Sequence, residues 1–220
     1  MSTPNVYIFL EYGILPLGHE IEKRRMTYLH HVLTVRENDP VRLVYDQGLK
    51  LPYEANWAND ITVLRSTYGI TQTDAEVARL TYQQWKGIVQ EKVERKVFEE
   101  LREKANGASK TKDLLYETFA PCSYLYSMDP FSARKIARFR SRMVLCKANQ
   151  KSAHMSMSCR AGCEAIETQE HLVNCVEIHG KGQENIETTA IKNMQVEILQ
   201  LLVKKLTVVE EWMEQKDVDS

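Results

Sequence analysis

The spacing of apolar residues between Tyr82 and Ala105 constrains the fold of this 220-residue chain most strongly. Apolar residues recur there every three or four positions, at Trp85, Ile88, Val89, Val93, Val97 and Leu101. This period matches an α-helix that buries one face. Residues 17–38, 39–48 and 57–69 also have helix signals, and only nine glycines and six prolines interrupt the chain. The sequence therefore predicts an all-α fold, built as a helical bundle.

Three of the five cysteines and one histidine fall in a short segment near the C-terminal end. Their pattern is Cys159–x3–Cys163–x7–His171–x3–Cys175. Three thiolates and one imidazole complete the tetrahedral coordination that Zn²⁺ prefers in structural sites. We expect these four residues to form a CCHC zinc knuckle.

The spacing of three residues between Cys159 and Cys163 is one longer than the usual two, so Cys159 is the weakest of the four assignments. His154 and His179 are the alternative ligands.

Local sequence around the cysteines is consistent with such a site. Gly162 directly precedes Cys163 and relieves a tight turn. Thr168 is a suitable cap for a helix in which His171 takes the third position. We expect that helix to place His171 and Cys175 on one face, one turn apart.

A long helix is predicted at the C-terminal end, from about Asn185 to Gln215. Six apolar residues track the a and d positions of a heptad repeat, which Lys205 breaks: Ile191, Met194, Ile198, Leu201, Val208 and Trp212. This stripe forms either a dimer seam or a contact with the chain's own body, and we favour the second. The predicted parts are a helical domain at 1–150, the knuckle at 151–180 and the C-terminal helix at 181–220.

Charge is distributed unevenly along the chain. Residues 130–163 contain eight Lys and Arg residues and no Asp or Glu, whereas residues 164–220 contain twelve acidic residues and five basic ones. Basic residues that track phosphates give salt-dependent binding that is blind to base sequence. The residues we expect to contact RNA or DNA are Arg134, Lys135, Arg138, Arg142, Lys147 and Lys151. Alternatively, the basic block is a solvated face or pairs with the acidic C-terminal helix.

One face of a predicted helix carries part of this block. We expect a helix over 132–149, in which Lys135, Arg138 and Arg142 share one face. The adjacent pair His30 and His31 diverges by about 100° on a helix, so we expect one buried, hydrogen-bonded imidazole and one exposed imidazole rather than a catalytic pair.

Three blocks of sequence together resemble the region that follows the polymerase core in non-LTR retrotransposon reverse transcriptases. They are "LEYGILPLGHEIEKRRMTYLHHVL", "FRSRMVLCKAN" and "CRAGCEAIETQEHLVNC", and they follow the family's order. The resemblance covers roughly residues 10–175. It implies that Cys159, Cys163, His171 and Cys175 are knuckle ligands, and the extra residue between the first two cysteines departs from the family's pattern.

Catalytic motifs are missing from the sequence. It has no Tyr–x–Asp–Asp motif for the two Mg²⁺ ions of a polymerase, no nuclease constellation, no P-loop and no Gly–x–Ser–x–Gly motif. We therefore expect a non-catalytic protein. The first hypothesis is a zinc-containing module that binds RNA or DNA, and the alternative is a scaffold protein or homodimer that uses the heptad-like helix.

Apolar runs in the sequence are short. A membrane-spanning helix needs about 20 apolar residues, and "VYIFL" is too short for the core of a signal peptide. An odd number of cysteines, five, fits reduced thiols better than a disulfide framework. We expect an intracellular protein, nuclear or cytoplasmic, without a membrane partner.

Overall fold

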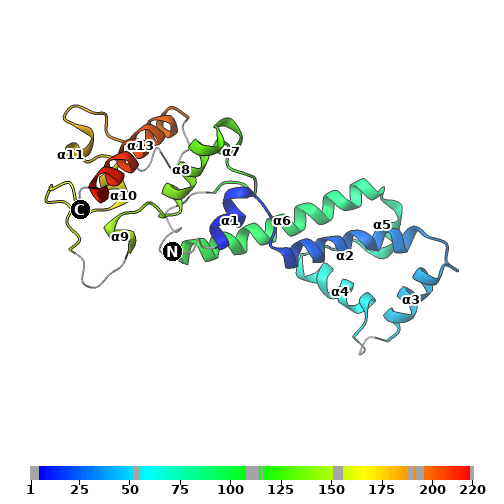
Figure 1. The fold of residues 1–220 in the computed structure, drawn as a ribbon. Coiled ribbons are helices and arrows are strands. Elements are labelled where there is room, and N and C mark those ends of the chain that lie inside the picture. Colours follow the sequence, from blue (N-terminus) through cyan, green and yellow to red (C-terminus); the bar gives the residue numbers. More distant parts are fainter. Residues whose placement is uncertain are drawn as a thin grey trace. The chain divides into compact units, whose positions relative to one another are not determined.

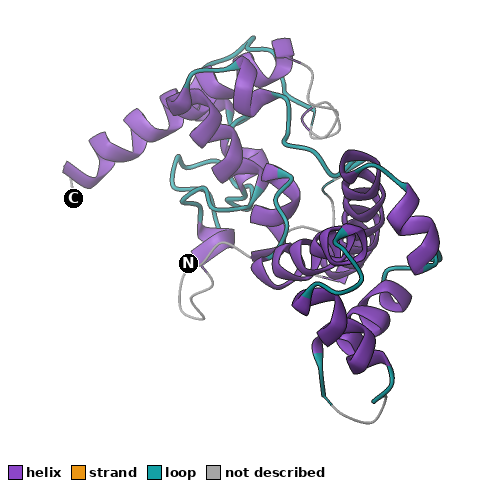
Figure 2. Cartoon of the chain, turned by 90° about the vertical axis from the view of Figure 1, so that its right-hand side faces the viewer, coloured by secondary structure: helices purple, strands orange, loops and turns teal. Residues whose placement is uncertain are grey.

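The computed structural model describes residues 5–51, 55–107, 114, 116–150, 156–187, 191 and 196–218 (Figure 1). These residues form helices and loops, and their β structure is limited to an isolated bridge between Ser158 and Ile166 (Figure 2). The predicted all-α class is therefore confirmed. None of the described helices is both long enough and apolar enough to cross a bilayer.

The chain divides into two compact units. The middle unit comprises Ile14–Arg102, and the terminal unit comprises Met1–Gly13 together with Glu103–Ser220. The division of the chain into 1–150, 151–180 and 181–220 stays a prediction.

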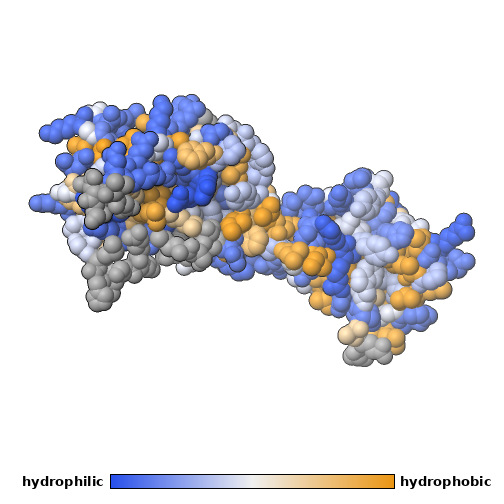
Figure 3. All heavy atoms as spheres, in the orientation of Figure 1, coloured by the Kyte–Doolittle hydropathy of each residue, from blue (hydrophilic) through white to orange (hydrophobic). Residues whose placement is uncertain are grey.

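The middle unit is built around the helix α2 (Leu17–Thr34). It also contains α3 (Pro40–Leu49), α4 (Trp57–Thr67), α5 (Asp74–Arg79) and the part of α6 (Tyr82–Gly107) that ends at Arg102. Helix α2 contacts α3, α4 and α5, and α3 contacts α4. Apolar side chains of α3 and α4 also lie at the surface of the middle unit (Figure 3).

Side-chain caps set the starts of three of these helices. Asp39 accepts a hydrogen bond from the helix it precedes, and Pro40 takes the first helical position. Asn56 caps α4 in the same way. Thr73 and Glu76 form a reciprocal capping box at the start of α5.

The predicted apolar stripe of α6 lies in the core of the middle unit. Trp85, Val89 and Val93 are fully buried there, and the Trp85 indole N–H donates to the Met26 carbonyl at 2.9 Å. His30 is buried and its Nε2 is 2.8 Å from the Leu80 carbonyl oxygen, whereas His31 is exposed. The expectation of one buried and one exposed histidine is confirmed.

Short helices and one long helix form the terminal unit. They are α1 (Asn5–Tyr12), the end of α6, α7 (Tyr124–Ser127), α8 (Pro130–Arg140), α9 (Lys147–Gln150), α10 (Gln169–Leu172), α11 (Val176–His179) and α13 (Val196–Val218). Helix α13 packs against α8 and α11, and α7 contacts α8.

The predicted start and register of the C-terminal helix are wrong. Residues 183–187 are coil, and the backbone N–H of Ile186 donates to the Asn174 side chain at 2.8 Å. The buried apolar residues of α13 are Leu199, Leu202, Leu206 and Val209, each one position beyond the predicted heptad register, and Lys205 is buried beside them. Val208 of the expected set is 39% exposed, and Met194 lies outside the described residues. The helix packs within its own unit, as the favoured interpretation expected.

The predicted helix over 132–149 is confirmed only as far as Arg140, where α8 ends, and its predicted C-terminal end is wrong. The N–H of Met143 donates to the Arg138 carbonyl at 2.8 Å, and the N–H of Arg142 donates to the Phe139 carbonyl at 3.0 Å. These are the two bonds of a Schellman motif. Arg142 takes the left-handed position with φ 53°. Glycine usually occupies this position. Because the residue here is Arg142, the sequence contains no glycine that would indicate the end of the helix.

Candidate metal centre

The four predicted ligands converge in the terminal unit. The ligand atoms of Cys159, Cys163, His171 and Cys175 all lie within 4.8 Å of one another. The sulfur of Cys163 is 3.7 Å from that of Cys175 and 3.0 Å from His171 Nε2. The sulfurs of Cys159 and Cys175 are 4.0 Å apart. Cys159, the least certain ligand on spacing alone, therefore belongs to the cluster.

A tight hairpin presents the first two cysteines. The N–H of Cys159 donates to the Ala165 carbonyl at 2.9 Å, and the N–H of Glu167 donates to the Met157 carbonyl at 2.8 Å. At the turn, Gly162 has φ +90°, a conformation that L-residues with a side chain rarely adopt. The glycine before Cys163 thus has the role that the sequence predicted.

His171 is presented by the short helix α10. The Thr168 side chain accepts a hydrogen bond from the His171 N–H at 3.0 Å, so His171 is the third helical residue. This cap confirms the expectation. The expectation of one continuous helix from His171 to Cys175 is wrong, because α10 ends at Leu172 and Cys175 is the N-cap of α11. The two ligands still meet, and only three residues separate the end of α10 from the start of α11.

A buried carboxylate ties the hairpin to the preceding segment. Glu167 is fully buried and accepts hydrogen bonds from the backbone N–H groups of Lys147, at 3.0 Å, and Arg160, at 2.8 Å. The Arg160 guanidinium donates to the same carboxylate at 2.8 Å. Burial would raise the pKa of Glu167, but these hydrogen bonds hold it below its ordinary value. Glu167 therefore fixes the backbone on both sides of Cys159.

The module also packs on an apolar base. Leu172 of α10, Cys146 and Val209 of α13 form one buried cluster, against which Ile178 and Met213 pack. Cys146 and Leu172 have no exposed surface. The cysteine hairpin and its helices are therefore attached to the body of the terminal unit.

Burial opposes the ionisation of two of the three thiols in the cluster. Burial raises the pKa of the Cys159 thiol to about 12 and raises that of Cys175. In Cys163, burial acts in the same direction, but hydrogen bonds from Cys159 and from the Ala165 backbone lower the pKa below its ordinary value. A divalent cation would offset the cost of burying thiolates, because it stabilises their charge directly.

Two of the sulfur–sulfur separations fit such an ion. A tetrahedral site with metal–sulfur bonds of about 2.3 Å places sulfur atoms about 3.8 Å apart, close to the observed 3.7 Å and 4.0 Å. Of the alternative ligands, His179 is engaged elsewhere, since its Nε2 is 3.0 Å from the Leu172 carbonyl oxygen. His154 lies outside the described residues.

The predicted nucleic-acid-binding residues occupy different environments. The Lys135 side chain is 4% exposed, and its ammonium group lies 2.8 Å from Glu210 Oε2 and donates to the Thr207 hydroxyl at 2.7 Å. Arg138 lies 3.7 Å from Glu210 Oε1 and is 40% exposed. Arg134 is exposed. Part of the basic block thus pairs with the acidic C-terminal helix, as the alternative interpretation expected.

The remaining three predicted residues follow α8. Arg142 lies beyond the helix end and therefore does not continue the α8 face. The Lys147 ammonium donates to the Ser158 carbonyl at 2.6 Å, on the cysteine hairpin. Lys151 lies outside the described residues.

A buried polar cluster in the terminal unit was not predicted. Glu11 has no exposed surface, and Arg140 donates to its Oε1 through Nε at 2.8 Å. The hydroxyls of Tyr116 and Tyr124 donate to the same carboxylate at 2.7 Å and 2.5 Å. Glu11 and Arg140 belong to two of the blocks that carry the family resemblance. No short-range sequence pattern indicates this pair, because the two residues are 129 positions apart.

Comparison of the chain with protein-family models, with curated proteins and with solved structures finds no match. The site is therefore interpreted from its own chemistry.

Proposed function

We propose that this protein is a non-catalytic zinc-binding module that contacts RNA or DNA. The observation that carries the proposal is the convergence of three sulfurs and one imidazole nitrogen within 4.8 Å. Three cysteines and one histidine form a closed ligand set of the structural type, which leaves no position for a reacting water. Zinc in such a site supplies folding free energy to a segment too short to form its own core.

Basic residues next to this module supply the phosphate contacts that we propose. Lys147 joins the basic block to the hairpin through the Ser158 carbonyl. Arg134 and Arg138 are on α8, and α8 packs against α13. Helix α13 also contributes Val209 to the apolar base of the module. Contacts of such residues with phosphates release condensed counterions, so binding should weaken steeply with salt.

We further propose kinship with the C-terminal region of non-LTR retrotransposon reverse transcriptases. The order of the three resembling blocks in the sequence supports it. The alternative, partner binding through α13, has less support because the face formed by Leu199, Leu202 and Leu206 is buried in its own unit.

A salt titration tests the nucleic-acid part of this proposal. Fluorescence anisotropy of a labelled random oligonucleotide, mixed with the full chain and zinc, should show binding at low salt with a steep logarithmic slope. Arg134→Glu should weaken binding and reduce the slope by about one. Arg24→Glu is the matched control, because Arg24 is 79% exposed on the middle unit. Absence of binding at low salt would overturn the proposal.

A further inference from the structure

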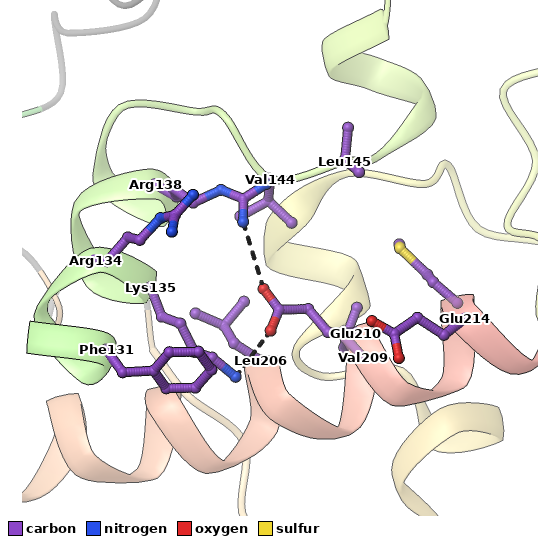
Figure 4. Close-up of a pocket in the computed structure, with 11 residues that line it drawn as sticks. Phe131, Arg134, Lys135, Arg138, Val144, Leu145, Leu206, Val209, Glu210 and Glu214 are labelled. Atoms are coloured by element: carbon purple, nitrogen blue, oxygen red, sulfur yellow. Dashed lines mark ion pairs between the residues drawn. The ribbon is translucent and has the colours of Figure 1, made fainter.

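A groove of about 390 Å³ lies between α8 and α13 in the terminal unit (Figure 4). This volume falls in the range of about 300–1,000 Å³ that is typical of ligand pockets. Its floor is apolar and includes Leu206 and Val209, which are 3% and 1% exposed. Val144, from the segment after α8, also lines it. The groove is separate from the four metal-binding residues, none of which lines it.

Two guanidinium groups at the edge of this groove are able to bind an anion. Arg134 and Arg138 lie one turn apart on α8 and both line the groove. The Arg134 side chain has no ion pair or hydrogen bond to the part of the chain that the structure describes. Arg138 lies 3.7 Å from Glu210, near the outer limit of an ion pair.

The acidic residues of the groove leave this positive edge intact. Glu210 is neutralised by Lys135 at 2.8 Å, and Figure 4 shows this carboxylate between Lys135 and Arg138. The second acid, Glu214, is drawn on α13 at the opposite side of the groove from Arg134. An anion at the α8 edge therefore has two arginines to bind and replaces only the weak contact between Arg138 and Glu210.

An exposed aromatic ring completes the site. Phe131 lines the groove and is 64% exposed, so its ring is accessible to a ligand. The Lys135 ammonium lies 4.5 Å from its ring centroid, which holds the ring beside the groove. Aromatic rings next to arginines are the elements that bind bases and phosphates of single strands.

We infer that this groove binds one unpaired nucleotide of a single-stranded nucleic acid. The base stacks on Phe131 and covers the apolar floor, while its phosphate lies between Arg134 and Arg138. A base in a duplex has both faces stacked, so the site selects single strands. This inference rests on the proposed nucleic-acid binding and narrows it to one class of nucleic acid.

Anisotropy measurements on the zinc-loaded full chain test the inference, with labelled oligo(dT) and a mixed-sequence duplex of equal length as probes. Oligo(dT) should bind more tightly than the duplex. Phe131→Ala should weaken oligo(dT) binding about 5- to 150-fold, the range of one lost base–aromatic stack, and should leave duplex binding unchanged. The matched control is Tyr126→Ala, because Tyr126 is 77% exposed in the same unit and does not line the groove.

A second variant tests the competition between Glu210 and the phosphate. Glu210→Gln removes the anion that contacts Arg138 and should tighten oligo(dT) binding by a factor of about two to five. Circular dichroism checks that each variant is folded. Equal effects of Phe131→Ala and Tyr126→Ala, or equal losses for both probes, would overturn the nucleotide site while leaving nucleic-acid binding in place. Failure of the unmodified chain to bind either probe would instead refute the proposed function.

Discussion

Replacement of Glu11 by alanine should strongly destabilise the terminal unit. Glu11 and Arg140 are 0% and 1% exposed at their side chains, and the guanidinium contacts both carboxylate oxygens, at 2.8 Å and 3.4 Å. Removal of one partner of a buried ion pair costs about 3–5 kcal/mol, because the other charge is left buried without compensation. The substitution also removes the acceptor of the Tyr116 and Tyr124 hydroxyls.

Each of these hydroxyls would add about 1–3 kcal/mol if it stayed unsatisfied. Water that enters the space left by the carboxylate will satisfy some of them, so the terms do not add fully. We therefore expect a loss near 5 kcal/mol. The double variant Glu11→Leu/Arg140→Met should recover most of this loss, since it leaves no buried charge behind.

Urea denaturation, followed by circular dichroism and by amide hydrogen exchange in α8, measures the effect in the terminal unit. The control is Arg25→Ala, which breaks a 2.7 Å ion pair with Asp60 whose side chains are 35% and 55% exposed. That change should cost no more than about 1 kcal/mol. A loss for Glu11→Ala as small as that of the control would refute the reasoning, and so would a double variant less stable than Glu11→Ala.

Three further predictions concern other residues. Gly87 is exposed within α6 and a Cβ there meets nothing within 4 Å, so Gly87→Ala should raise the free energy of unfolding by about 0.5–1 kcal/mol; a lower melting temperature would contradict this. Burial and the Glu11 charge raise the pKa of Tyr116 and Tyr124. Because the folded state holds these protons more tightly, stability should fall as pH rises above about 10, and ultraviolet titration should show the two phenols ionising only as the fold is lost. Burial lowers the pKa of Lys205, which is 4% exposed, so Lys205→Met should raise the melting temperature, and a decrease would show that its charge is stabilising.

The metal cluster could be predicted because its information is local. The four ligands fall within a short segment, and the turn at Gly162 and the cap at Thr168 follow rules that act over a few residues. The helices of the middle unit were predictable for the same reason, since their caps and apolar periods are contained in their own sequences.

Features that depend on distant residues were missed or remained one of two alternatives. The carboxylate that binds Arg140 is 129 positions away in the sequence, and Glu210 approaches Lys135 only after α13 packs on α8. The register of α13 was wrong because both Ile198–Leu201 and Leu199–Leu202 are apolar pairs with helical spacing. Packing against α8 and α11, which the periodicity does not encode, decides which pair is buried.

The zinc content of the purified full chain tests the central claim most directly. Elemental mass spectrometry should find one zinc per chain in the unmodified protein and in Cys122→Ala, which removes a buried thiol outside the cluster. Cys163→Ser and His171→Ala should each lose the metal or retain only a fraction of it. A metal-free unmodified protein, or full zinc occupancy in both ligand variants, would contradict the claim that these four side chains hold one ion.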